Sequence, residues 1–327
     1  MVLEQLNSPT IQIFPREDGT IPIWDHPNFK SRVTLPDDYF AITRAEQGLE
    51  MIHQGRLNDE ALMIMKVIGD AYCLNENQLR RYMLKKMSFS QTSKYLKRLR
   101  KYGFVERHKC RLAFIEEDGE ETVKPPAPFT LGIGGYKLMS HLYPEFHFIQ
   151  PDYWIEQPLA IQRYVAMNEV RCLMMEAGVL RKWKWNPYIG GSPKYKRPMA
   201  VGQLETSQGT IQFLLERPQM SQNFVGYLKT KFEEYRFLFE RDRHFKLDSF
   251  SPADYQIVAL YVSSVSMANY IREEVRPFNL PFDVWVFIDE WIDEERGLAT
   301  AGALMNQDQL KRIQIDFLTK KKIESLT

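Results

Sequence analysis

The stretch Gln78–Arg111, QLRRYMLKKMSFSQTSKYLKRLRKYGFVERHKCR, concentrates the positive charge of this chain. Twelve of its 34 residues are Lys or Arg, and Glu106 is its one acidic residue. The stretch therefore has a net charge of about +11, whereas the whole chain of 327 residues has a net charge of +1. The rest of the chain is acidic by about ten charges. A basic segment this concentrated is typical of a surface that binds a polyanion.

The same stretch has the pattern of two short helices joined by a break. We expect one helix over Gln78–Lys86, a break at Met87-Ser88-Phe89, and a second helix over Ser90–Tyr102 that a serine at position 88 or 90 caps. Gly103 follows at the place where a helix usually stops. The second helix has apolar residues at helical spacing along one side, which are Tyr95, Leu96, Leu99 and Tyr102.

Residues 58–142 together predict a winged helix-turn-helix domain. Asn58 or Asp59 can cap a helix that precedes the two described above. After them, strand patterns lie at 104–107, 112–115, 122–123 and 129–131. Three helices followed by a strand pair are the element order of this fold. The glycines of Gly132–Tyr136 (GIGGY) lie at the wing exit and lack the GK[ST] sequence of a phosphate loop.

In this fold the second helix of the pair lies in the major groove, with its N-terminal residues at the base edges. Lys and Arg further along contact phosphates. The alternative is a solvated charged helix in a domain that binds protein, but the charge coincides with the position that the fold presents to DNA. The predicted DNA-binding residues are Ser90, Gln91, Lys94, Lys97, Arg98 and Lys101 on the helix, and Arg107, Lys109 and Arg111 on the wing.

The rest of the chain predicts an α+β protein with a second domain. Residues 1–57 are rich in Pro, Asp and Gly and read as an N-terminal arm, and residues 143–158 read as a linker. Residues 159–327 have the order helix, three strands, helix, strand, helix, strand and predict an α/β domain. The first six of these elements are also the order of a restriction-endonuclease-like core.

Active members of that class bind Mg²⁺ through an acid at the start of the second strand and an acid-x-Lys on the third, because the metal needs hard oxygen ligands. Here the second strand opens with Arg197-Pro198-Met199-Ala200, without an acid. Glu216 ends the third strand, but no Lys lies two residues beyond it, and Glu205 is the other weak catalytic candidate. We therefore expect a nuclease-like domain that is inactive, with no metal site and no cofactor.

A second basic patch surrounds the first strand of that domain. Basic residues interleaved with aromatic ones suit nucleic-acid contact through stacking and charge. A half-buried strand with Trp183 and Trp185 inward and its lysines outward explains the pattern equally well. The residues of this patch are Lys182, Lys184, Lys194, Lys196 and Arg197.

Composition restricts the location. The three cysteines form no CxxC pair and no zinc spacing, which favours a reducing cytoplasm. The start of the chain lacks a basic region followed by an apolar run, and no apolar stretch approaches the roughly 18 residues of a membrane span. We expect a cytoplasmic protein that does not bind membranes.

Three strings resemble the replication-relaxation family of plasmids, integrative elements and phages of Gram-positive bacteria. They are TSKYLKRLRKYGFVER (Thr92–Arg107), FTLGIGGYKLM (Phe129–Met139) and LLERPQMSQNFVGYLKTKFEEYRFLF (Leu214–Phe239), the last with Lys231 and Tyr235 at similar spacing. The resemblance covers about Leu57 to Ile288. It implies DNA binding in plasmid replication, DNA relaxation or conjugative mobilisation. This chain has Glu205 and Glu216 without a complete set of metal ligands, which argues against a nuclease role.

These observations predict a non-enzymatic DNA-binding protein of a mobile element. Its partners would be double-stranded DNA and a relaxase or replication initiator. A homodimer fits such a protein because helix-turn-helix proteins often read two half-sites, although no coiled-coil heptad supports it. Two alternatives stay open: a transcriptional regulator whose C-terminal domain senses a ligand or dimerises, and a metal-dependent nuclease.

Overall fold

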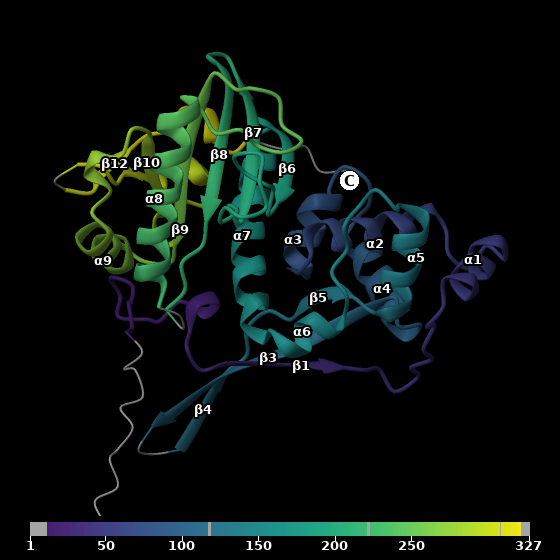
Figure 1. Ribbon diagram of the computed structural model, residues 1–327. Coiled ribbons are helices and arrows are strands. Elements are labelled where there is room, and N and C mark those ends of the chain that lie inside the picture. The colour runs from purple at the N-terminus through teal and green to yellow at the C-terminus, as the bar shows by residue number, and fades with distance from the viewer. Residues whose placement is uncertain (1–11, 117–118, 221–222, 308, 322–327) are drawn as a thin grey trace, which may run out of the picture. The chain divides into compact units, whose positions relative to one another are not determined.

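The computed structural model describes residues 12–116, 119–220, 223–307 and 309–321. They form a mixed α+β fold with two sheets, which confirms the predicted α+β class (Figure 1). The chain divides into two compact units. We call Asn28–Cys172 the five-stranded unit, and the residues up to Pro27 with Leu173–Lys321 the seven-stranded unit. No helix in the described part of the chain is long and apolar enough to cross a membrane.

Helices α2, α3, α4 and α5 of the five-stranded unit contribute buried side chains to one apolar core. Asn58 caps α2 by accepting from the Ala61 backbone N–H at 3.2 Å, and Asn75 forms a capping box with Gln78. The helices are α1 (Ala45–His53), α2 (Asp59–Ala71), α3 (Glu76–Met83), α4 (Phe89–Lys101), α5 (Ile133–Leu142), α6 (Asp152–Glu156) and α7 (Pro158–Glu176).

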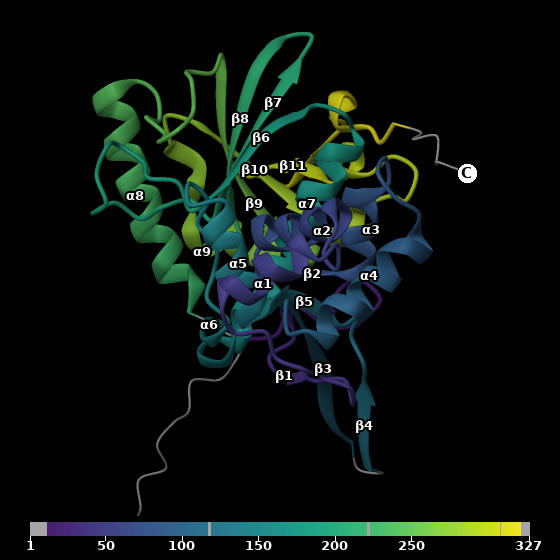
Figure 2. The same ribbon diagram turned by 90° about the vertical axis from the view of Figure 1, so that its right-hand side faces the viewer.

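The sheet of this unit has the order β1-β3-β5-β2, with β4 also paired to β3 (Figure 2). The expected strands at 104–107 and 112–115 are one continuous strand, β3. A further strand, β1, lies in the segment that the sequence analysis assigns to an N-terminal arm, and it pairs antiparallel with β3. The strands are β1 (Phe29–Thr34), β2 (Leu74–Asn75), β3 (Val105–Glu116), β4 (Gly119–Val123) and β5 (Pro128–Leu131).

The division between the units differs from the expected linker at 143–158. The boundary falls after Cys172, inside α7. The first turns of α7 belong with α2 and α3: the Asn168 side-chain amide donates to the Ala71 and Cys73 carbonyl oxygens at 2.9 and 2.8 Å, and the Gln78 amide donates to Val165 O at 2.8 Å. These buried hydrogen bonds attach the first part of α7 to α2 and α3, although the sequence analysis assigned this helix to the second domain.

The seven-stranded unit contains a mixed sheet of order β12-β11-β10-β9-β8-β7-β6. Strands β8, β9 and β10 are parallel, and the other neighbours are antiparallel. The strands are β6 (Leu180–Trp185), β7 (Ala200–Thr206), β8 (Gly209–Glu216), β9 (Tyr255–Val262), β10 (Asp283–Ile288), β11 (Gly302–Leu304) and β12 (Lys311–Ile313).

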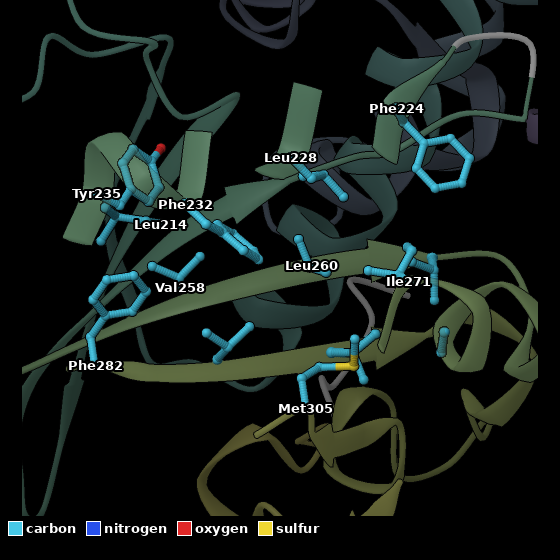
Figure 3. Packing of buried hydrophobic residues seen from close by; sticks show 14 of the residues in the cluster. Leu214, Phe224, Leu228, Phe232, Tyr235, Val258, Leu260, Ile271, Phe282 and Met305 are labelled. Atoms are coloured by element: carbon cyan, nitrogen blue, oxygen red, sulfur yellow. The ribbon is translucent and has the colours of Figure 1, made fainter. Parts of the chain in front are cut away.

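Helices α8 (Phe224–Asp242) and α9 (Val265–Val275) cover one face of this sheet (Figure 1). Leu228 and Phe232 of α8 and Ile271 of α9 pack against Leu214 and Leu260 of the parallel strands (Figure 3). Burial of these side chains is the main force that holds the layers together. Short 3₁₀ helices complete the described chain at Ile23–Asp25, Pro277–Asn279, Asp289–Trp291, Leu298–Thr300 and Asp316–Leu318.

Candidate nucleic-acid interface

Helix α4 begins at a capping box that its own sequence supplies. The Ser88 hydroxyl accepts a hydrogen bond from the Gln91 backbone N–H, and the Gln91 side-chain oxygen accepts from the Ser88 backbone N–H at 2.9 Å. This reciprocal pair satisfies two backbone donors at the helix start. Ser88 is therefore the N-cap, and Ser90 lies in the first turn.

The apolar side of α4 decides which of its side chains face outward. Leu96 and Leu99 are buried in the core, and Thr92 is buried beside them. Tyr95 and Tyr102 pack at the edge of the same core. Helical geometry turns the residues between these positions to the opposite side. The predicted DNA-binding residues that are exposed on α4 are Ser90, Gln91, Lys94, Lys97 and Arg98.

An open pocket of about 550 Å³ lies along this exposed side. Its lining contains two acidic side chains, Asp38 and Glu76, and Glu76 is paired with Arg80 at 2.7 Å. Cations outnumber these acids, so the pocket favours an anionic ligand. The basic residues of its lining are Lys94, Lys97, Arg98, Arg100, Lys101 and Arg107.

Contacts within the unit hold two of the predicted residues. Lys101 Nζ lies 2.9 Å from the Asp38 carboxylate, and this hydrogen bond holds the pKa of Asp38 below its usual value. The Arg98 guanidinium donates to the Arg56 carbonyl oxygen. For the side chains of Lys94 and Lys97, the described residues provide neither a hydrogen bond nor a salt bridge. These two lysines are therefore the side chains of α4 best able to bind an external anion.

Strand β3 carries the predicted wing residues on one face. Arg107, Lys109 and Arg111 are exposed, whereas His108 and Cys110 between them are buried. This alternation follows from the period of two in a β-strand. Arg107, Lys109 and Arg111 are therefore on one exposed face of β3.

The pairing with β1 adds basic residues that the sequence analysis missed. Lys30 lies opposite Arg111 and Arg32 lies opposite Lys109 in the antiparallel register. Both β1 residues are exposed, and directly opposite residues of an antiparallel pair point to the same face. The apolar and polar alternation of FKSRVT (Phe29–Thr34) is the local signal that could have identified this strand.

The glycines of GIGGY serve packing. A Cβ at Gly135 would lie 2.0 Å from Phe104 O, and one at Gly134 would lie 2.5 Å from Ile42 O. Both distances are closer than van der Waals contact allows. The glycines let the start of α5 approach the turn between α4 and β3 closely.

The second basic patch is largely engaged within the seven-stranded unit. Lys184 pairs with Asp248 at 2.8 Å and Lys196 pairs with Glu234 at 3.1 Å. Lys182 donates to the Ser249 carbonyl oxygen, and the Arg197 guanidinium lies 3.8 Å from the centre of the Tyr188 ring. Lys194 lies over the ring of its neighbour Tyr195. These contacts favour the interpretation of a structural strand and loop, with Trp185 buried and Trp183 half-buried.

Glu216 lies in a closed polar cluster. Its carboxylate is 2.7 Å from Lys231 Nζ and accepts a hydrogen bond from the Tyr235 hydroxyl at 3.0 Å. The Lys231 ammonium also donates to Arg197 O at 2.6 Å and to the Tyr227 hydroxyl at 3.0 Å, so its three protons each have an acceptor. Burial raises the pKa of Glu216, and Lys231 opposes that shift.

Glu205 lies at the other end of the β7–β8 hairpin. It is paired in register with Thr210, whose hydroxyl donates to both of its carboxylate oxygens at 3.1 and 3.0 Å. The position opposite Glu216 is six residues back along β7, which corresponds to roughly 20 Å at the rise of a strand. Glu205 and Glu216 therefore do not share a metal ion. In the described residues, no group of three or more His, Cys, Asp or Glu side chains is placed to hold one.

The carboxyl ends of β8, β9 and β10, where open α/β sheets usually bind ligands, are occupied by the chain itself. Asp25 is buried there and accepts from the Met220 backbone N–H and the Ser263 hydroxyl, both at 3.0 Å. Arg16 pairs with Asp289 at 2.7 Å. Burial raises the pKa of Asp25, and the nearby Arg217 opposes that shift. Asp289, the first acidic residue after β10, thus has a structural partner.

The comparisons with known proteins add little to this geometry. No protein-family model matches the chain, and no curated protein matches it. Among solved structures, restriction endonuclease FokI is similar to the chain at 12% identity over 71% of this chain and 42% of that one, with a TM-score of 0.27. The chain thus spans less than half the length of that endonuclease. A TM-score this low carries no argument, so the interface rests on its own residues.

Proposed function

We propose that the five-stranded unit is a winged helix-turn-helix domain that binds double-stranded DNA, with α4 as the recognition helix. In this proposal α2, α3 and α4 are the three helices, and β3 with its neighbouring strands is the wing. Such a domain places the N-terminal half of its recognition helix in the major groove. Lys94 and Lys97 would then meet phosphates or base edges from the exposed side of α4.

The observation that carries the proposal is the outward face of α4. Lys94 and Lys97 are exposed, lie one helical turn apart and line a pocket rich in cations. No carboxylate in the described residues forms a salt bridge with either of them. A solvated surface helix usually mixes both signs of charge, whereas Phe89–Lys101 contains no acidic residue at all.

For the biological setting, we propose replication, DNA relaxation or conjugative mobilisation of a mobile element. The three strings that resemble the replication-relaxation family support this proposal. A relaxase or a replication initiator would be the protein partner. The resemblance lies in residues 92–107, 129–139 and 214–239, so it includes α4 and the polar cluster around Glu216.

For the seven-stranded unit, we propose an inactive restriction-endonuclease-like core. The antiparallel run β6, β7, β8, followed by α8 and by β9 parallel to β8, supports this proposal. Glu216 stands at the end of β8, but Lys231 and Tyr235 occupy its carboxylate. The unit would then contribute partner or DNA contacts rather than strand cleavage.

The DNA-binding proposal is tested with Lys94→Glu/Lys97→Glu in the full chain. Each charge-assisted contact is worth about 1.5–3 kcal/mol, so we expect the affinity for a fluorescent duplex of mixed sequence to fall about 100-fold or more. Fluorescence anisotropy at fixed salt measures the affinity, and circular dichroism checks that the fold is intact. Exposed positions on a helix usually tolerate such changes.

The matched control is Lys137→Glu/Lys229→Glu, which makes the same charge change at exposed lysines on α5 and α8. We expect this control to bind DNA close to the wild-type affinity. If the α4 variant and the control lose affinity equally, overall charge and not the face of α4 governs binding. Unchanged DNA binding by the α4 variant would contradict the proposal that α4 is the recognition helix.

A further inference from the structure

We infer that the paired strands β1 and β3 form a second phosphate-binding surface, which contacts the backbone of the same duplex that α4 binds. The inference rests on the proposed function, and it assigns a role to a strand that lies outside the helix-turn-helix. We call the surface the cation ladder. Its members are Lys30, Arg32, Arg107, Lys109 and Arg111.

The ladder is built from like charges that face each other. Lys30 is directly opposite Arg111, and Arg32 is directly opposite Lys109. Side chains in such pairs start about 5 Å apart, and like charges at that separation destabilise a sheet. The ladder contains two such like-charge pairs next to each other. A bound polyanion would stabilise the folded protein, because the anion removes their repulsion.

The ladder also lacks neutralising partners. For Lys30, Arg32, Lys109 and Arg111, the part of the chain that the structure describes offers no salt bridge or side-chain hydrogen bond. This contrasts with Lys184 and Lys196 of the seven-stranded unit, which both pair with carboxylates.

The cation ladder continues into the cation-rich pocket beside α4, and this continuity identifies the ligand. Arg107, at one end of the ladder, lines the same pocket as Lys94 and Lys97. In addition, the Arg100 side chain of α4 donates a hydrogen bond to the Thr34 carbonyl oxygen at 3.2 Å, which connects α4 directly to β1. From Arg107 the ladder extends four residues along β3, roughly 13 Å. A duplex seated on α4 is therefore the polyanion that this surface fits.

The chemistry of the ladder favours phosphates over bases. Apart from the half-buried Thr34, its positions on the two paired strands carry only Lys and Arg, the side chains that bind phosphate through charge. Neither an amide nor a carboxylate, which would read adenine or cytosine edges, is among them, so guanine is the base whose edge these side chains could also bind. We therefore expect the ladder to add affinity chiefly through phosphate charge.

The test is Lys30→Gln/Arg32→Gln, which removes the β1 half of the ladder and keeps polar side chains. Each phosphate contact contributes about 0.9 to the slope of log affinity against log salt, so we expect the slope to become shallower by roughly 1.8. The loss of affinity should be equal for duplexes of different sequence. Because the change relieves two like-charge pairs, the melting temperature at low salt should equal or exceed that of the wild type.

Lys109→Gln/Arg111→Gln, on the β3 side of the same pairs, should reproduce the shallower slope. The matched control is Lys137→Gln/Lys229→Gln, which should leave the slope unchanged. A wild-type slope in both ladder variants would overturn the inference while the α4 proposal stands. Conversely, shallower slopes in the ladder variants together with unchanged DNA binding by the α4 variant would contradict the proposal that α4 is the recognition helix and would support the cation ladder. Tighter, ladder-dependent binding of single-stranded RNA or of an acidic peptide would overturn duplex DNA as the ligand.

Discussion

His108 is a neutral residue in the middle of a basic strand. It is buried between Arg107 and Lys109, and its Nε2 lies 3.0 Å from the Thr130 hydroxyl. Burial lowers the pKa of His108 to about 4. The folded protein thus holds an uncharged imidazole on one side of β3 and exposed cations on the other, because adjacent residues of a strand point to opposite faces.

This burial predicts a pH dependence of stability. The unfolded chain binds a proton at His108 below pH of about 6.5, whereas the folded protein binds it only near pH 4. Lowering the pH through this range therefore lowers the free energy of unfolding, by up to about 1.4 kcal/mol per pH unit. In His108→Gln this contribution should vanish, and urea unfolding of both proteins between pH 7 and pH 4.5 measures the difference.

Glu106 acts in the opposite direction, because burial raises its pKa to about 7. Its contribution to stability is present at low pH and is lost as the pH rises from the unfolded value through 7. Both proteins contain Glu106, so its effect cancels in the difference between them. A difference that does not change with pH would contradict a buried, neutral His108.

Lys231 is a second residue whose surroundings predict a measurable effect. It is completely buried, and its pair with Glu216 is closed from solvent. Removing one partner of such a pair leaves an uncompensated buried charge, which costs about 3–5 kcal/mol. We expect this loss of unfolding free energy in Lys231→Met, measured by urea denaturation at pH 7.

The double variant Lys231→Met/Glu216→Gln should recover part of this loss, since it leaves no unpaired charge. Lys229→Met, at an exposed position of the same helix, should stay within about 0.5 kcal/mol of the wild type. A small effect of Lys231→Met would show that the cluster opens to water and would revive Glu216 as a catalytic candidate.

At the scale of elements, local periodicity predicted the helices of residues 58–142, although the helix expected over Gln78–Lys86 lies at Glu76–Met83. The second predicted helix, Ser90–Tyr102, agrees with α4 (Phe89–Lys101) to within one residue at each end. Its cap and apolar side depend only on residues within a few positions of each other. The outward position of Lys94 and Lys97 follows from the same local pattern.

The pairing of strand β1 could not be predicted from the local sequence. The strand is short, and it is stable only because it pairs with β3, about eighty residues further along the chain. Half of the cation ladder therefore depends on a contact between distant parts of the chain. Arg107, Lys109 and Arg111 were identified from the sequence, but the opposing pairs that Lys109 and Arg111 form with β1 were not.

At the scale of the whole molecule, the arrangement of carboxylates argues against strand cleavage by the seven-stranded unit. Glu216 is held by Lys231 and Tyr235, and Glu205 lies at the far end of its hairpin. Metal-assisted phosphodiester hydrolysis needs convergent oxygen ligands. We therefore expect supercoiled plasmid to remain intact when the protein is added with Mg²⁺ or Mn²⁺, as monitored on agarose gels.

The control for that experiment is a metal-dependent nuclease under the same conditions. Nicking by the wild type that disappears in Glu216→Gln would contradict the inactive core. Nicking that persists in Glu216→Gln and in Glu205→Gln would indicate a contaminating nuclease.

By itself, the sequence determined the helices around Gln78–Arg111, the basic side of α4 and the alternation along β3, because these features depend on neighbouring residues. Only the tertiary structure decided that β1 completes the ladder, that α7 is divided between the units and that Lys231 neutralises Glu216. Each of these features joins segments far apart in the chain. Burial of shared apolar surface selects such partners, and no local pattern specifies them.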